Sequence, residues 1–584
     1  MAEVLISPGV LARENDQSQI TSQPVQAGAA IIGPAVKGRK NIPKLVTSYS
    51  EYLANFGSTF LSGSSQYTYF TSISAYNYFQ NGGTSLIVTR TTSASFSPAT
   101  SSFIASSSLS PIGAGISGNN GVFELEVLSD GEIMNSTGSG VSTGPNGTYT
   151  SGSSDNFRWE ISTPNTSSGV FSLIIRQGND TATAKQVVET FSNLSLDPLQ
   201  PNYISKVVGD QTTNVRGTGT GVYLQPSGSF RNASRYVRVK AVHSKTPNYF
   251  NNDGSAKDIF TGSIPSAQTG AFGGGLGSNV PTREGRYYAK VNNSDSQGLL
   301  GADYTTAINL LANRDEFRYN MITSPGLIAV NGTTGAGWTT IQSNCETRGD
   351  AIFVGDLVNY DSTITQVTTQ AASVDSSYCA TYWPWLQVTD PDSRELVWVP
   401  ASTMIPGVYA YNDRAGEPWF APAGINRGGL GAVNQAERKL TNTNRDTLYT
   451  GKVNPIATFP GQGIVVFGQK TLQTKASALD RVNVRRLLIT LKNYISQIAD
   501  TLVFEQNTAA TRNTFLSQVN PYLESVQQRQ GLYAFKVVMD NTNNTPDVID
   551  RNELIGAVYL QPTKTAEFIY IDFNILPTGA TFPA

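Results

Sequence analysis

The stretch RVNVRRLLITLKNYISQIADTL, residues 481–502, carries one apolar stripe at helical spacing. The apolar positions recur every three or four residues and are Val484, Leu487, Leu488, Leu491, Ile495, Ile498 and Leu502. A helix with one such stripe packs that side against a core and leaves its other side polar. The pattern predicts a helix from Asp480 to about Asn507, lying on one side of a domain.

The segments that follow predict a second helix and two strands. The helix starts near Thr508, and Pro521 either kinks it or opens a new one. The strands are expected at 554–560 and 565–576. In the last strand one face is apolar, formed by Ile569, Ile571, Phe573 and Ile575. Burying these side chains is worth roughly 6–12 kcal/mol as an upper limit. The strand belongs either to a sheet of its own chain or to one in another subunit.

The first 20 residues have the pattern of a second extended arm. Val4, Leu5 and Ile6 form a short strand-like run before Pro8, and Val10 follows the turn. Fully extended, such a segment spans roughly 65 Å, enough to cross a neighbouring subunit. With strands at both ends of the chain, we expect that both are donated to other copies.

Two distant zones predict a mixed α/β domain. In residues 21–92 we expect a strand, two helices and a buried strand, at Val25–Ile32, Ser48–Phe56, Tyr69–Asn81 and Ser85–Arg90. From residue 302 to about 450 a helix and two strands are expected, at Tyr304–Leu311, Met321–Ala329 and Ala351–Gly355. Residues 451–562 are assigned to a separate C-terminal inner domain and 563–584 to the C-terminal arm.

Residues 93–301 are rich in Ser, Thr, Gly and Asn and predict one or two inserted β domains that face outward. Short strands are expected at Gly121–Leu128, Phe157–Ile161 and Val170–Arg176. One helix is expected among them, with apolar positions Val187, Val188 and Phe191. The predicted fold class is therefore a multidomain α+β protein, with a mixed α/β inner part built from both ends of the chain, β-rich insertions and strand arms.

Composition limits the function. The chain has 584 residues, a net charge of −2 and 14% charged residues, where roughly 25% is usual in soluble domains. Without a basic surplus we expect no direct binding of nucleic acid. The single histidine, His243, and two cysteines give no recognisable catalytic or metal-binding pattern, so no enzyme, metal or cofactor is expected. We also expect no signal peptide and no membrane insertion.

Several segments, in this order, resemble the tail sheath proteins of contractile-tailed bacteriophages of the T-even-like kind. They are SPGV (7–10), NLSLDP (193–198), NYISKVVGD (202–210), PGVYAYND (406–413), WFAPAG (419–424), RVNVRRLL (481–488), FEQN (504–507), NTPDVIDRNE (544–553) and YLQP (559–562). FEQN departs slightly from the usual FEPN of the family. Residues 93–190 and 211–300 carry no such segment.

The resemblance implies a mechanical, non-enzymatic protein. Sheath subunits form hexameric rings stacked helically around an inner tail tube, and the sheath shortens to drive the tube through the host envelope. The implied partners are copies of the chain itself, the tube protein, and baseplate and tail terminator or neck proteins. The implied place is the virion tail, assembled in the host bacterial cytoplasm. A sheath of a phage-derived injection particle or secretion system is an alternative, and a β-rich tail adhesin is a more distant one.

The resemblance also implies where subunits touch. In the family the N-terminal arm and the C-terminal strand add to sheets of neighbouring subunits, and the inner domain lines the tube. The candidate tube-facing residues are Arg481, Arg485, Arg486 and Lys492. The alternative for them is a solvated polar helix face. Flexible hinges are expected at Asn15–Gln23 and Pro562–Lys564.

Overall fold

The computed structural model describes residues 25–569, with gaps at 63–64, 94, 102–103, 107–120, 136–151, 279–290, 292–295 and 330–332. Most residues of the two arms fall outside the described part of the chain. These are the N-terminal candidates Val4, Leu5, Ile6 and Val10 and the C-terminal candidates Ile571, Phe573 and Ile575. The expected hinge at Asn15–Gln23 also lies outside it. Ile569 is described, has no strand partner, and is 76% exposed.

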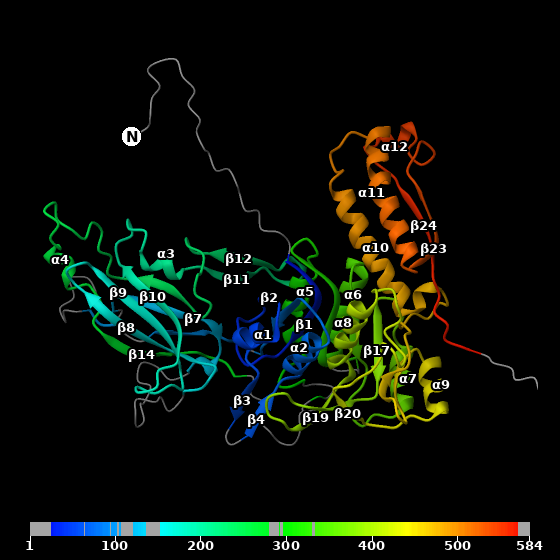
Figure 1. Ribbon diagram of the computed structural model, residues 1–584, viewed down its shortest axis with the longest axis horizontal. Helices are drawn as coiled ribbons and strands as arrows, with labels where there is room; N and C mark the ends of the chain where they lie inside the picture. Colours follow the sequence, from blue (N-terminus) through cyan, green and yellow to red (C-terminus); the bar gives the residue numbers. More distant parts are fainter. Residues whose placement is uncertain are drawn as a thin grey trace, which may run out of the picture.

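Eight strands from two distant parts of the chain form the central sheet (Figure 1). In spatial order they are β2 (Pro43–Val46), β5 (Leu86–Arg90), β1 (Val25–Gly33), β15 (Phe317–Ile328), β16 (Ile352–Asp356), β17 (Cys379–Trp383), β21 (Asn454–Phe459) and β22 (Gly463–Val466). The six inner strands are parallel, and the two outer strands, β2 and β22, are antiparallel to their neighbours. This arrangement needs helices on both faces of the sheet.

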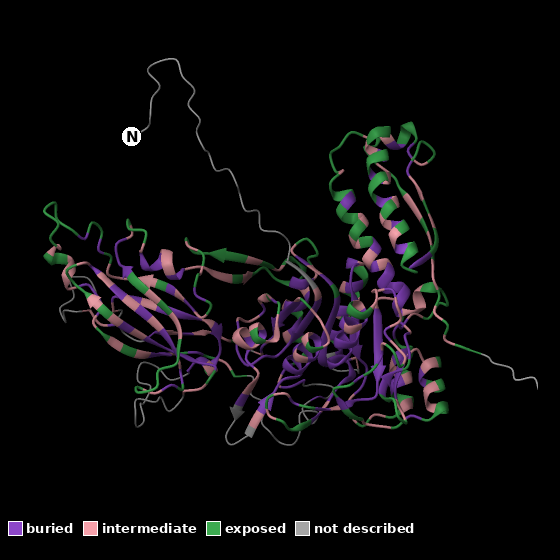
Figure 2. Ribbon diagram, viewed as in Figure 1, coloured by how far each residue is buried: buried purple, intermediate pink, exposed green. Residues whose placement is uncertain are grey.

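Both faces of the central sheet are buried, as Figure 2 shows. In β1, Ala29 and Ile31 lie in one core and Ala30 and Ile32 in the other, because successive strand residues point to opposite faces. The first core is closed by α1 (Tyr49–Phe56), α2 (Phe70–Gln80) and α8 (Ile405–Ala415). The second is closed by α5 (Gly301–Leu311), α6 (Thr333–Arg348), α7 (Ile364–Ala372) and α9 (Asn442–Thr450).

Local sequence signals account for the first helices. The Ser48 hydroxyl accepts a hydrogen bond from the backbone N–H of Glu51 at 3.2 Å, and Gly57 ends α1 at φ +68°. The helix expected at Ser48–Phe56 is confirmed as α1, with Ser48 as its cap. The expected helix at Tyr69–Asn81 is α2, and the expected strand at Ser85–Arg90 is β5, which is wholly buried.

Between β5 and α5 the chain builds a seven-stranded antiparallel sheet, at the left of Figure 1. Its strands, in spatial order, are β10 (Val187–Ser195), β9 (Val170–Gln177), β8 (Phe157–Asn165), β14 (Gln268–Gly273), β6 (Pro98–Ser101), β7 (Phe123–Asp130) and β13 (Val237–Val242). Trp159, Phe123 and Phe171 are fully buried in its core. Alongside lie α3 (Ile204–Val208), α4 (Asp258–Thr261) and the hairpin of β11 (Thr212–Arg216) and β12 (Tyr223–Ser227).

The helix predicted around Val187, Val188 and Phe191 is wrong, because this segment is the strand β10. It pairs with β9 and has two register irregularities, one between Val187 and Glu189 and one between Phe191 and Leu194. An irregular strand loses the strict alternation of apolar and polar residues. The remaining apolar spacing of one and four residues fits a helix equally well.

The C-terminal unit stands at the right of Figure 1 and is built from two long helices, one short helix and a hairpin. Its elements are α10 (Val482–Asp500), α11 (Ala509–Gln528), β23 (Leu532–Val538), α12 (Pro546–Asp550) and β24 (Ala557–Pro562). The predicted stripe faces the core of this unit, in which Leu487, Leu491 and Val519 are buried. Thr508 caps α11, and Pro521 lies within the helix without ending it.

Two boundaries differ from the sequence prediction. The expected separate domain from residue 451 begins later, because β21 and β22 belong to the central sheet. The first long helix ends at Asp500 rather than near Asn507. Two small sheets complete the central region, one of β19 (Leu396–Val399), β18 (Leu386–Thr389) and β20 (Val433–Ala436), the other of β3 (Thr59–Ser62) and β4 (Ser65–Thr68).

Candidate assembly surfaces

Arg485, the second of the four candidate cations, is buried against the central domain. Its guanidinium lies over the Tyr378 ring, 3.9 Å from the centroid, and donates a hydrogen bond to the Ser377 hydroxyl. The residue is 4% exposed. Burial lowers the pKa of Arg485, and Tyr378 partly offsets that effect. The side chain therefore fastens α10 to its own chain.

Arg486 is held in the same way on the next position of the helix. It forms an ion pair with Asp413 of α8 at 2.6 Å, and its guanidinium carbon lies 4.6 Å from the centre of the Tyr409 ring. Burial alone would lower the pKa of Arg486, but the charge of Asp413 outweighs it and raises that pKa. Because Arg486 is 6% exposed, removing Asp413 would leave a buried charge unpaired.

Arg481 and Lys492 are the more accessible pair. Arg481 precedes α10, and its side chain is 24% exposed; its Nε donates to Glu567 at 2.8 Å. Lys492 is exposed, and its Nζ donates to the Tyr378 hydroxyl at 3.2 Å. The alternative of a solvated polar face is thus wrong for Arg485 and Arg486. Contact of these residues with a tube stays a prediction, and Lys492 is the candidate with a solvent-facing side chain.

Sequence reasoning missed the residues that hold these cations. Tyr378, Asp413 and Glu567 come from three separate parts of the chain, and only Asp413 lies in one of the quoted segments, PGVYAYND (406–413). Glu567 left one signal, since it is the single acidic residue at the start of an apolar strand pattern. The other two could be found only from the packing of α10 on the central domain.

The hairpin of β23 and β24 forms a two-stranded sheet, and among the described residues no third strand pairs with either edge. Its inner face packs on the C-terminal core through Phe535, Val537 and Leu560. Its outer face shows Tyr533, 64% exposed, and Tyr559, 62% exposed. Unpaired strand edges carry free N–H and C=O groups and accept further strands.

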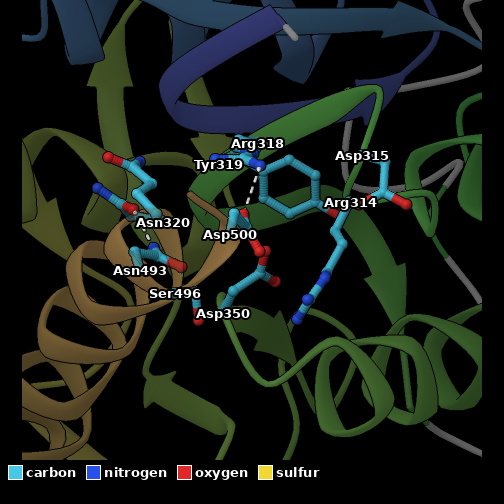
Figure 3. A pocket seen from close by; sticks show the side chains of 10 residues that line it. Arg314, Asp315, Arg318, Tyr319, Asn320, Asp350, Asn493, Ser496 and Asp500 are labelled. Carbon is cyan, nitrogen blue, oxygen red and sulfur yellow. Dashed lines mark hydrogen bonds and ion pairs between the residues drawn. The ribbon is translucent and has the colours of Figure 1, made fainter. Parts of the chain in front are cut away.

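A polar cavity separates the second half of α10 from the turn between α5 and β15 (Figure 3). Across it Arg318 and Asp500 approach to 3.9 Å, and Asn493 donates to Asn320 at 3.3 Å. Asp500 is 61% exposed, so this ion pair is weak. Against the central domain, α10 is therefore packed tightly at its start and loosely at its end.

The described residues contain no group of three His, Cys, Asp or Glu placed to hold a metal ion. Cys345 and Cys379 are free thiols, and burial raises the pKa of Cys345 to about 12. A thiol with so high a pKa is a poor nucleophile. No helix in this part of the chain is long and apolar enough to cross a membrane.

The open edges of the β23–β24 hairpin are places where a strand of another chain can add. Residues 297–472 match the family model "Phage tail sheath protein central domain", and residues 474–576 match "Phage tail sheath C-terminal domain". Residues 297–472 and 474–576 are therefore similar to the two domains of phage tail sheath proteins, and together they make up a little less than half of the chain. The division between the two matches follows β22 and precedes α10, where the fold also divides.

Two curated relatives from phages match part of the chain. Over 216 residues, 37% of the chain, it is 41% identical to the tail sheath protein of Vibrio phage KVP40, and the match covers 31% of that protein. Over 229 residues, 39% of the chain, it is 35% identical to the tail sheath protein of Enterobacteria phage T4, covering 35% of it. The chain thus matches about a third of the length of these relatives.

The fold is similar to the crystal structure of the sheath tail protein Lin1278 from Listeria innocua. The TM-score is 0.51 at 10% identity, and the alignment covers 92% of this chain and 95% of that one. At this identity the likeness concerns the fold alone.

Proposed function

We propose that this chain is a structural subunit of a phage contractile tail sheath. It polymerises as stacked hexameric rings around the inner tail tube and contracts to drive the tube through the host envelope. The match of residues 297–576 to the two sheath domains carries this proposal. The named relatives are phage proteins, which favours a virion tail over an injection particle or secretion system.

Strand addition at the β23–β24 hairpin links the subunits in this proposal. The N-terminal segment with Val4, Ile6 and Val10 and the C-terminal segment with Ile571 and Phe573 are the donated strands. Each new backbone hydrogen bond contributes about 1 kcal/mol. A head-to-tail contact whose rotation does not close produces an open helix rather than a finite ring.

Contraction then proceeds by exchange of contacts between subunit bodies, from a metastable extended state to a shorter one. It needs no cofactor or bound nucleotide. Lys492, on the exposed side of α10, is the proposed contact with the tube. The baseplate and the neck or terminator proteins are the proposed partners at the two ends, and the host cytoplasm is the proposed place of assembly.

Electron microscopy of the purified protein tests the proposal. We expect hollow, striated cylinders wider than a tail tube, and discrete monomers or trimers under all conditions would contradict it. Deleting 1–20 or 570–584 should leave a folded monomer that does not polymerise. The second deletion spares residues 563–567, which contact the body of the subunit. Polymers of normal stability from both deletions would contradict strand exchange.

A further inference from the structure

The segment after β24 was expected to hinge at Pro562–Lys564, but it lies along the body of its own subunit. From Thr563 to Glu567 every second residue faces inward and the others face solvent. The Thr563 N–H donates to the Gly531 carbonyl at 3.2 Å and its hydroxyl to the Gln530 carbonyl at 2.7 Å. A segment bonded at this point cannot act as a free hinge.

The next inward residues cross to the central domain. Gln469, which follows β22 and is 3% exposed, donates from Nε2 to the Thr565 hydroxyl at 2.6 Å and to Glu567 at 2.9 Å. Thr563 is bonded within the C-terminal unit, whereas Thr565 and Glu567 are bonded to the central domain. The segment therefore ties the two together.

Glu567 is the centre of this contact. Besides Gln469, the Arg481 Nε donates to its carboxylate at 2.8 Å and the Tyr449 hydroxyl at 2.6 Å, and the side chain is 18% exposed. Burial alone would raise the pKa of Glu567, but these three donors together lower it. Charge-assisted hydrogen bonds to a partly buried carboxylate are among the stronger polar contacts in proteins.

The partners of Glu567 are themselves fixed in place. Arg481 is also paired with Asp480 at 3.0 Å, and Lys470 donates to the Tyr449 carbonyl at 2.8 Å with its ammonium 4.2 Å from the ring centre. The positive charges of Arg481 and Lys470 thus balance the negative charges of Asp480 and Glu567. All four side chains lie around Tyr449. A carboxylate held by preorganised donors loses little further entropy when it binds.

The bonded segment ends at Glu567. Phe568 is 69% exposed and Ile569 is 76% exposed, although Ile569 is the next position in the inward series. Neither side chain is among the residues that form or pack against the apolar cores of the described chain. The apolar alternation predicted for the donated strand thus begins where the contact with the subunit's own body stops.

We propose that Thr563, Thr565 and Glu567 form a strap that fixes the root of the C-terminal arm to the central domain, so that the arm leaves the subunit at Phe568 in one direction. Beyond Phe568 the arm binds to a second copy of this chain. That part of the proposal rests on the proposed function. The strap restricts the volume that the arm searches, which raises the effective concentration of its strand at the neighbour's sheet edge.

Limited proteolysis of the soluble subunit tests the strap without reference to sheath assembly. Lys564 is exposed but lies inside the strap, so trypsin cuts after it only when the strap opens. For Glu567→Ala we expect cleavage at Lys564, followed by intact mass, to be roughly tenfold faster or more. Glu553→Ala is the matched control, because the ion pair of Glu553 with Arg551 is about half exposed and lies outside the strap.

Tyr449→Phe keeps the ring and removes one donor, so it should give a smaller acceleration, and it keeps the test valid if Glu567→Ala does not fold. Cleavage of folded Glu567→Ala at the wild-type rate would overturn the strap. Light scattering then measures the concentration at which polymers form, which Glu567→Ala should raise roughly fivefold or more. Faster cleavage with unchanged polymerisation would overturn the role of the strap in assembly. A wild-type chain that never polymerises would instead overturn the proposed function.

Discussion

The central sheet is joined to the β-rich insertion and to the C-terminal unit by two different kinds of junction. At the insertion, Arg39 pairs with Glu126 at 2.6 Å and with Asp130 at 2.9 Å, and both carboxylates are over 90% buried. Arg90, 2% exposed, donates to the Asp130 carbonyl at 2.7 Å. This junction is a buried ionic network.

The junction with the C-terminal unit combines apolar packing and one largely buried ion pair, Arg486 with Asp413, with a polar gap. Val482 and Ile489 of α10 lie in a core of the central sheet, and Trp419 of the central region lies in the core of the C-terminal unit. Farther along α10, Arg318 and Asp500 meet across the cavity of Figure 3. The insertion is therefore fixed in one orientation, whereas the C-terminal unit is fixed at one end of α10 and weakly held at the other.

Among the changes that distinguish the two junctions, Trp419→Ala should lower stability the most. Trp419 is 3% exposed, and its indole donates to the Arg529 carbonyl at 3.0 Å. Its removal leaves a cavity that lowers the free energy of unfolding of the C-terminal unit by about 3–5 kcal/mol. Hydrogen exchange should rise in α10, α11 and β23 but not in the insertion. An equal rise of hydrogen exchange in the C-terminal unit and in the insertion would contradict the difference between the two junctions.

Arg39→Ala should have a smaller effect, confined to the other junction. Glu126 keeps Arg238 as a partner at 2.9 Å, and the Lys40 N–H still donates to Asp130 at 2.8 Å. We expect a loss of about 2 kcal/mol in the stability of the insertion, measured by hydrogen exchange in β7. Lys240→Ala removes an exposed pair on the neighbouring strand and is the control. A similar loss of stability in Arg39→Ala and in Lys240→Ala would mean that burial of the ionic network adds nothing to the stability of the insertion.

Acid should weaken the insertion junction selectively. Burial alone would raise the pKa of Glu126, but Arg238 and Arg39 outweigh it and lower that pKa. A lowered folded-state pKa gives stability that is present above the usual Glu pKa near ~4.3 and is lost as the pH falls through the lower folded value. Hydrogen exchange in β7 should therefore rise below about pH 4. In Arg39→Ala, hydrogen exchange in β7 should depend less on pH than in the wild type. An equal dependence would exclude the pairing of Arg39 with Glu126 as the cause.

Asp500→Asn should have the smallest effect, below about 0.5 kcal/mol in unfolding experiments, because its pair with Arg318 is long and exposed. A larger loss would show that the polar gap is a firm contact and that the two ends of α10 are held equally.

Much of the fold could be predicted because its signals are local. The Ser48 cap and the Gly57 stop define α1, and the apolar stripe of α10 defines the core of the C-terminal unit. The strand β10 was missed because its irregular pairing is set by β9, which lies elsewhere in the sequence. The extent of the central sheet was missed because the pairing of β21 with β17 joins residues about 70 positions apart.

The candidate site was harder to predict for the same physical reason. A helix pattern shows which side is apolar, but it does not show that a second domain covers the charged side. Arg485 and Arg486 were therefore read as surface cations, although Tyr378 and Asp413 bury them. The hinge at Pro562–Lys564 was inferred from polar composition, and the bonds of Thr563 to Gln530 and Gly531 could not be inferred from it.

The position of β1 has a mechanical consequence. The strand that follows the N-terminal segment is parallel to both of its neighbours, β5 and β15, in the middle of the central sheet. A pull on its first residue, Val25, runs along the strand and loads its backbone hydrogen bonds to both neighbours in shear, so that they must break together. Peeling from an edge would break them one at a time. Tension that enters through the N-terminal segment is thus carried by a strand that is hydrogen-bonded along both of its edges.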